Sequence, residues 1–165
     1  MRRRGWGISG LSAFVALLLA GPAHSAPVAA PTLDARVAQA VIAGCAAHAA
    51  GKRQSHAIAV VDAGGHSIAS LRMDGNGYGI MDFALAKAQA AAAWGFATAR
   101  MADGARETPG FDRAPHVVTV AGGLPIFSLN GARLGAVGVS GEAPADDVAC
   151  AEAGIGAAGL RSTPG

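Results

Sequence analysis

The sequence predicts an α+β domain, an antiparallel sheet layered with helices, in the order α-β-β-α-(α)-β-β-β-α. Apolar residues recur at helical spacing near both ends of the chain, and an Ala-rich helical stretch lies between them. Two pairs of apolar segments, each joined by a turn-forming sequence, indicate antiparallel hairpins. Hairpins that flank helices favour a layered α+β sheet over a parallel Rossmann sheet.

The first helix and hairpin follow from local signals. Thr32 offers an N-cap, and the apolar stripe behind it ends at Gly51, which suits a helix C-terminus. Residues 56–62 are apolar and β-branched, which predicts a buried strand. After a Gly-rich turn, its antiparallel partner is expected over 66–73.

The middle of the chain is expected to be helical. Residues 74–79 form a flexible Gly-rich loop, and an Ala-rich helix then runs to Trp94. This helix carries Lys87 on its apolar face. A shorter helix is expected over 97–105, and residues 106–115 form a loop.

The clearest local signal is a hairpin near the C-terminus. Its strands, 125–129 and 132–139, are joined by Asn130-Gly131, the pair best suited to a type I′ turn. A short strand is expected before it, over 116–120. A last helix begins at Pro144, with Asp146 and Asp147 in its first turn.

The N-terminus has the three parts of a secretory signal. Three arginines precede an uncharged apolar run of about 12 residues, and small residues surround a cleavage point after Ser25. A bilayer span needs roughly 20 residues, so a cleaved signal is favoured over a retained anchor. We predict a signal peptide over 1–25, a linker over 26–31, a domain over 32–160 and a disordered tail over 161–165. The protein is expected to be periplasmic or secreted.

Cleavage would remove most of the basic character. Without the three arginines the chain has 10 basic and 11 acidic residues, which gives a net charge of −1. No basic face remains to attract nucleic acid or a membrane, so neither is expected as a partner. The Ala- and Gly-rich composition implies a thin core, which favours a homo-oligomer.

Several kinds of site are missing from the sequence. It has no Rossmann or Walker loop, no Gly-x-Ser-x-Gly elbow and no histidine pair at zinc spacing. Covalent c-type haem is excluded, because no Cys-x-x-Cys-His is present. Cys45 and Cys150 form one disulfide in an oxidising compartment or remain two buried thiols.

Three stretches of the chain carry a family resemblance. They are Val60-Val61-Asp62-Ala63-Gly64-Gly65-His66 with Arg72-Met73-Asp74-Gly75; Ala84-Leu85-Ala86-Lys87-Ala88 with Ala92-Ala93-Trp94-Gly95-Phe96-Ala97-Thr98; and Gly122-Gly123-Leu124-Pro125-Ile126 with Asn130-Gly131, Leu134-Gly135-Ala136-Val137-Gly138-Val139-Ser140-Gly141 and Asp146-Asp147. Together they resemble the GlcG/HbpS-like family of haem-binding or haem-associated proteins, over roughly residues 32–158. Two positions depart from the family pattern, at Ala97-Thr98 and at Ala143-Pro144.

The resemblance implies a profilin-like fold, with the first and last helices on one face of the sheet and the middle helices on the other. It also implies a homo-oligomer, a small-molecule ligand and haem as the cofactor. A periplasmic oxidoreductase or a sensor is the implied protein partner. If the first and last helices are neighbours, Cys45 and Cys150 can meet in a disulfide.

Haem needs an apolar slot and an axial ligand. His116, which follows a Pro-containing loop, is the best single candidate for that ligand; the alternative is an exposed or strand-edge histidine. Met73 and Tyr78 lie at the Gly-rich loop and either pack in the core or line the slot.

Lys87 and four small residues form a candidate anion site. The lysine either extends to solvent or pairs with a carboxylate, a haem propionate or a substrate acid. Gly122, Gly123, Ser140 and Gly141 offer backbone amides near strand ends, or form turns that require glycine.

These features support two functional hypotheses. The first is an exported small-ligand binding protein that binds haem or its iron. The alternative is an enzyme or accessory protein that acts on a small oxidised, acidic metabolite in a periplasmic oxidation pathway. The sequence assigns no catalytic residue and favours the binding protein.

Overall fold

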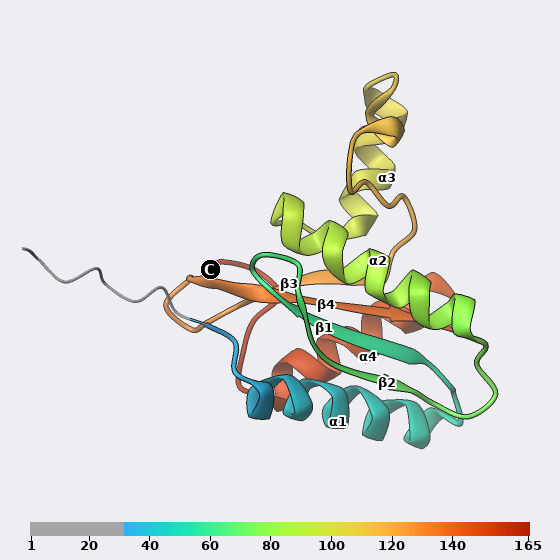
Figure 1. The fold of residues 1–165 in the computed structure, drawn as a ribbon, viewed down its shortest axis with the longest axis vertical. Coiled ribbons are helices and arrows are strands. Elements are labelled where there is room, and N and C mark those ends of the chain that lie inside the picture. The colour runs from blue at the N-terminus through green and yellow to red at the C-terminus, as the bar shows by residue number, and fades with distance from the viewer. Residues whose placement is uncertain (1–31) are drawn as a thin grey trace, which may run out of the picture.

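The protein folds as a four-stranded antiparallel sheet with helices on both faces, in a computed structural model that describes residues 32–165 (Figure 1). The expected signal peptide and linker lie outside the described residues. The sheet order is β2-β1-β4-β3. The elements are α1 (Ala35–Lys52), β1 (Ala57–Asp62), β2 (Ser67–Arg72), α2 (Tyr78–Trp94), α3 (Thr98–Glu107), a 3₁₀ turn η1 (Phe111–Arg113), β3 (Gly123–Phe127), β4 (Arg133–Ser140) and α4 (Pro144–Ala157).

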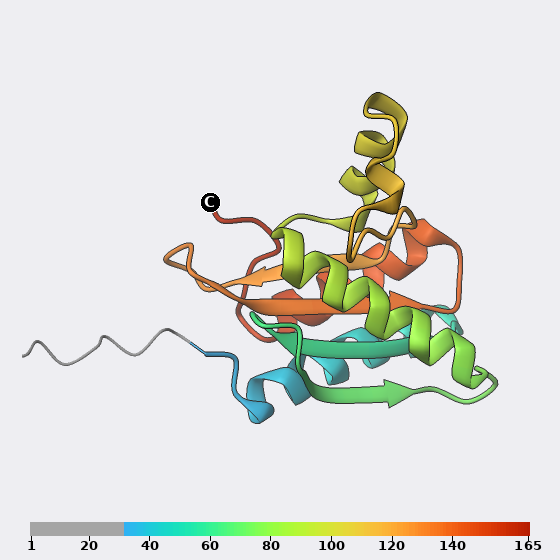
Figure 2. The same ribbon diagram turned by 45° about the horizontal axis from the view of Figure 1, so that its top comes forward.

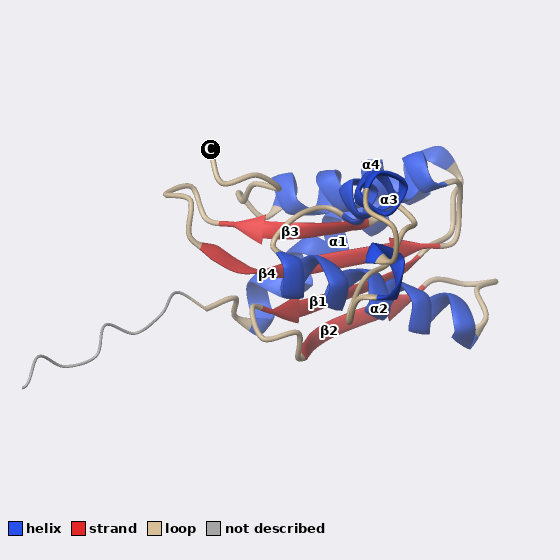
Figure 3. Cartoon of the chain, turned by 90° about the horizontal axis from the view of Figure 1, so that it is seen from above, coloured by secondary structure: helices blue, strands red, loops and turns tan. Residues whose placement is uncertain are grey.

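Two apolar layers form because side chains alternate along the buried strands. Ile58 and Val60 of β1 pack with α1 and α4, whereas Ala57, Ala59 and Val61 pack with α2. Figure 3 shows the sheet from above with helices on both sides. The predicted fold class and the placement of the first and last helices on one face are confirmed.

The layer under α2 is built from small residues, so the helix approaches the sheet closely. A Cβ at Gly138 of β4 would lie 2.0 Å from the Ala84 carbonyl oxygen of α2. Any larger residue there would push the helix away. The Ala- and Gly-rich composition therefore gives tight layers and a thin core.

The disulfide between Cys45 and Cys150 is present, with a Cα–Cα distance of 4.6 Å. It joins α1 to α4, and both cysteines are fully buried. The prediction that followed from the resemblance is therefore confirmed.

The α3 helix contacts the sheet at its first residue, where the Thr98 hydroxyl accepts from the Gly123 amide of β3 at 3.0 Å, and its C-terminal part extends away from the sheet. Figure 2 shows it projecting beyond α2, with η1 beside it. We call residues 98–113 the α3 arm. None of the described helices is long and apolar enough to cross a membrane.

The strand expected over His116–Val120 is not formed. His116 has a left-handed φ of +57°, and the Val117 amide bonds back to the Ala114 carbonyl oxygen at 3.3 Å. This turn interrupts the extended backbone that a ladder needs. The C-terminal part of the sheet therefore consists of two strands, β3 and β4, where three were expected.

The C-terminal hairpin is confirmed, but its turn is not type I′. Only Gly131 has positive φ, the Gly131 amide bonds the Ser128 carbonyl oxygen, and the strand register shifts beside Phe127. This is the three-residue hairpin loop with a left-handed glycine. Beyond the expected domain end, Arg161 exchanges two backbone hydrogen bonds with Phe127 at 2.7 and 2.9 Å.

Candidate functional site

The residues predicted to bind an anion come together at one end of the sheet, around Lys87 of α2. The Lys87 ammonium donates to the Asp147 carboxylate and to the Val139 carbonyl oxygen, each at 2.9 Å. It also lies 4.9 Å from the centre of the Phe83 ring. Lys87 is 1% exposed, so it pairs with a carboxylate and does not extend to solvent.

Asp147 also holds a histidine. His56, fully buried at the start of β1, places Nδ1 at 3.1 Å from one Asp147 oxygen, and the Glu142 amide donates to the same oxygen at 3.2 Å. We call Lys87, Asp147 and His56 the buried triad. It connects α2, on one face of the sheet, with α4 on the other.

Sequence reasoning missed the role of His56 and placed Asp147 only at a helix start. His56 was expected in a strand, and no motif connects it to residues 31 and 91 positions away. The only sequence signal of a role for His56 was its position directly before an otherwise apolar strand. Pairing it with Asp147 required the three-dimensional fold.

The glycines beside Lys87 make room for its side chain. Gly122 has φ +119°, and a Cβ there would lie 2.5 Å from the Val139 oxygen and 2.9 Å from Lys87 Nζ. A Cβ at Gly123 would lie 2.4 Å from the Lys87 carbonyl oxygen. Gly141 has φ +139°, and Ser140 is buried at the end of β4.

Replacing Gly122 by Ala is expected to lower the free energy of unfolding by about 2–4 kcal/mol, because it adds backbone strain and a steric conflict at the triad. Chemical denaturation measures the change. Gly51→Ala is the matched control, since Gly51 has no atom within 4 Å of an added Cβ. Equal stability of the two variants would contradict the close packing around Lys87.

A second group of residues lies at the base of the α3 arm and is partly exposed. Trp94 meets Phe96 and Phe111 edge to face, with ring centres 6.0 and 5.2 Å apart. The Arg100 guanidinium lies 5.3 Å from the Phe96 ring centre. A cavity of about 340 Å³ lies here, and its lining residues are Phe96, Arg100, Asp103, Gly104, Glu107 and Phe111.

His116 is exposed next to this aromatic group. The Trp94 indole N–H donates to the carbonyl oxygen of Pro115 at 3.1 Å, which fixes the residue before His116 against the indole. We call Trp94, Phe96, Arg100, Phe111 and His116 the aromatic surface. Its side chains supply an imidazole, aromatic rings and a guanidinium.

Met73 and Tyr78 lie elsewhere. Met73 lines an open groove of about 420 Å³ with Gln54, Ser55, Leu71, Arg72 and Asp74. Tyr78 begins α2 with 83% of its surface exposed and does not line this groove. Met73 and Tyr78 therefore do not share this groove as the expected slot required.

Metal-binding clusters of three or more His, Cys, Asp or Glu side chains do not occur within residues 32–165. A metal held by protein atoms alone therefore has no ready site in this part of the molecule. An iron held in a porphyrin differs, because the protein then needs to supply only an axial ligand.

The layered sheet with α1 and α4 on one face and α2 on the other defines a profilin-like α+β domain. Residues 33–156 match the protein family described as "Haem degrading protein HbpS-like". The chain belongs to this HbpS-like family. No curated protein sequence gives a significant match.

Solved structures share the fold. A double mutant of Streptomyces reticuli HbpS is 29% identical, with a TM-score of 0.70, and the match covers 81% of this chain and 97% of that one. The complex of PduOC with haem is 23% identical, with a TM-score of 0.74 and coverage of 80% and 99%. The Klebsiella pneumoniae protein ORFY is 24% identical, with a TM-score of 0.75 and coverage of 82% and 97%. The last two comparisons support the fold alone.

Proposed function

We propose that the protein is an exported haem-binding protein and that haem binds at the aromatic surface. The observation that carries the proposal is that His116 is exposed and that the residue before it, Pro115, accepts a hydrogen bond from the exposed Trp94 indole. Membership of the HbpS-like family, whose description names haem, supports the same ligand.

The side chains of the aromatic surface are of the chemical types that bind haem. His116 would give an axial nitrogen, the ligand most often used for haem iron. Trp94 and Phe111 would cover the apolar porphyrin edge, and Arg100 would pair with a propionate. When bound, haem would supply an iron centre whose reactivity depends on its axial ligand and on the polarity around it.

Titration of the purified protein with hemin tests the proposal. We expect a saturable Soret band at one haem per subunit, because one aromatic surface is present on each chain. A weak change that does not saturate, like that of hemin on any apolar surface, would reject haem binding.

The His116→Ala variant tests the ligand separately. We expect weaker binding and a shifted Soret band, since the axial nitrogen is lost. His66→Ala is the matched control, because His66 is an exposed histidine at the β1–β2 turn, where it contacts Asp62. A saturable band that is unchanged in His116→Ala would reject His116 as the ligand and leave haem binding intact.

Export is part of the proposal and is supported by the N-terminal sequence and by the disulfide, since disulfides persist in oxidising compartments.

Self-association is proposed as well, because the exposed large apolar residues include Tyr78, Phe83 and Trp94, all on α2. Mass determination by light scattering checks it: a mass above that of one chain is expected, and a monomer would contradict it.

The alternative function has no separate support. An enzyme acting on a small acid required Lys87 and the neighbouring glycines to receive that acid. In the structure their carboxylate partner is Asp147 of the same chain.

A further inference from the structure

The ring nitrogen Nε2 of His56 is buried without a hydrogen-bond partner among the described residues. The other ring nitrogen contacts Asp147 at 3.1 Å, and the side chain is fully buried. A buried polar atom left unpaired costs about 1–3 kcal/mol. Nε2 of His56 is therefore a buried ring nitrogen that is free to exchange a hydrogen bond or a proton with a neighbouring group.

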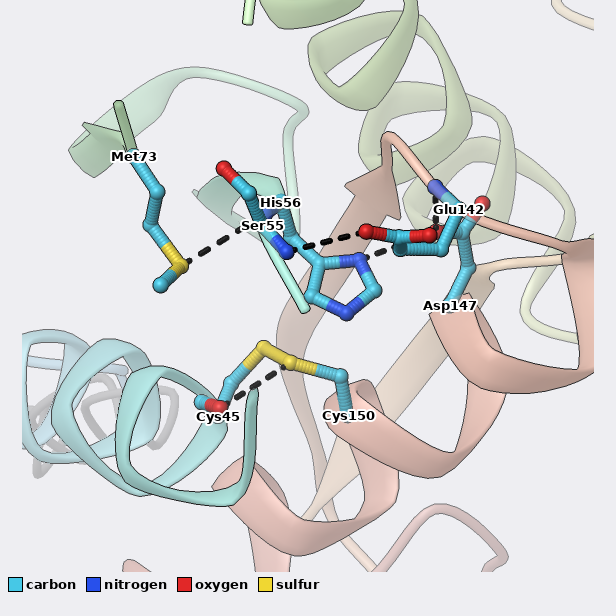
Figure 4. The surroundings of a disulfide bond; sticks show 7 residues. All are labelled: Cys45, Ser55, His56, Met73, Glu142, Asp147 and Cys150. Atoms are coloured by element: carbon cyan, nitrogen blue, oxygen red, sulfur yellow. Dashed lines mark hydrogen bonds and ion pairs between the residues drawn. A yellow bond between two sulfur atoms is a disulfide. The ribbon is translucent and has the colours of Figure 1, made fainter. Parts of the chain in front are cut away.

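In the view of Figure 4 the disulfide appears on the side of the imidazole away from Asp147, and no hydrogen bond joins His56 to either sulfur in the oxidised state. Asp147 and Cys150 are three residues apart on α4, so their side chains are neighbours on one face of the helix. Figure 4 shows the His56 ring between Asp147 and the Cys45–Cys150 bond, with its second nitrogen turned toward Cys150. A disulfide sulfur has no proton to donate, whereas a thiol has one.

We propose that His56 takes the proton of Cys150 when the disulfide is reduced, so that the reduced protein holds a Cys150 thiolate beside a His56 imidazolium. The roles follow from the geometry. Asp147 holds the Nδ1 hydrogen, which leaves Nε2 as the acceptor, as in nucleophile–base–carboxylate sites. Neither haem binding nor the aromatic surface is required.

The charges around the imidazole balance in this state. Asp147 of α4 pairs with Lys87 of α2 at 2.9 Å, and the new imidazolium pairs with the new thiolate. The ionisable residues on the adjoining part of α1 are Cys45, the other half of the disulfide, and His48, whose Nε2 is buried without a hydrogen-bond partner among the described residues. The Glu142 carboxylate accepts from the Ser55 amide at 3.0 Å, next to His56 in the chain. The site thus holds two opposite-charge pairs.

The thiolate would prepare the pair for oxidation by an external small-molecule disulfide. Cys150 is fully buried, so this exchange requires the site to open. In the open state the Cys150 sulfur attacks one sulfur of that reagent, forms a mixed disulfide and releases one thiolate. Cys45 loses its proton to solvent and attacks the Cys150 sulfur, which releases the second thiolate. Two electrons pass from the cysteines to the reagent, and His56 returns its proton to a released thiolate.

Single-cysteine variants test the proposal. Cys45→Ala leaves Cys150 beside His56, and Cys150→Ala leaves Cys45 as the matched control. The ultraviolet absorbance of the thiolate at neutral pH reports ionisation without requiring access for a reagent. A free thiol is only a few per cent ionised at pH 7. We expect Cys150 to be mostly thiolate, about tenfold or more above Cys45, and to revert to thiol when His56→Gln is added.

Equal ionisation of the two cysteines, or a Cys150 signal that does not change in His56→Gln, would overturn the proposal. If circular dichroism shows that Cys45→Ala is unfolded, the measurement moves to the reduced parent chain and its His56→Gln variant. There the parent alone is expected to show one thiolate per chain, and the same low signal in both would reject the proposal.

Discussion

Replacing Asp147 by Asn is expected to lower the free energy of unfolding by about 3–5 kcal/mol, because the Lys87 ammonium then stays buried without an anionic partner. Lys87 and Asp147 have side chains that are 1% and 3% exposed, so water cannot replace the lost charge. Asn keeps the volume and can still accept from the Glu142 amide. Urea denaturation monitored by circular dichroism measures the loss.

Two further variants separate the charge from other effects. Asp62→Asn changes a carboxylate that is 41% exposed, and we expect a loss below about 1 kcal/mol. Adding Lys87→Met to Asp147→Asn removes both charges and should restore part of the stability. An Asp147→Asn loss as small as that of Asp62→Asn would contradict a buried ion pair.

Removing the disulfide is the second large change. The double variant Cys45→Ala/Cys150→Ala is expected to lose about 2–5 kcal/mol, since the bridge restricts the unfolded chain across a long loop. The two cysteines are 105 residues apart and join α1 to α4, the two helices that cover one face of the sheet. Thermal and urea unfolding midpoints measure the effect.

The proper comparison is between oxidised parent and double variant, each confirmed by mass spectrometry. Because both sulfurs are fully buried, a mild reductant should open the bridge only as fast as the protein unfolds. Identical unfolding midpoints with and without the bridge would contradict its stabilising role.

The sequence was sufficient for the elements whose signals are local. The apolar spacing of α1 and α4, the β-branched strand β1 and the glycine turn of the last hairpin all follow from short-range chemistry. The strand predicted over 116–120 was wrong, because the apolar β-branched residues of this segment are typical of a strand. The left-handed turn at His116 follows Pro115, whose carbonyl oxygen accepts from Trp94, 21 residues earlier, and no local spacing rule reveals such a contact.

The sequence pointed to individual residues of the candidate sites but not to the partners of those residues. Lys87, Gly122 and Gly123, which the sequence offered as parts of an anion site, lie together, but the carboxylate that pairs with Lys87 is Asp147 of the same chain. The partner of His56 could not be predicted, since 91 residues separate it from Asp147 and no spacing rule connects a strand to a later helix. The aromatic surface likewise depends on how the α3 arm folds back.

A crystal structure of the protein with hemin, with iron located by anomalous scattering, tests the central claim most directly. The account predicts an iron peak within bonding distance of the His116 imidazole and a porphyrin against Trp94 and Phe111. Iron bound at the Met73 groove, or a saturated protein with no iron near the α3 arm, would contradict it.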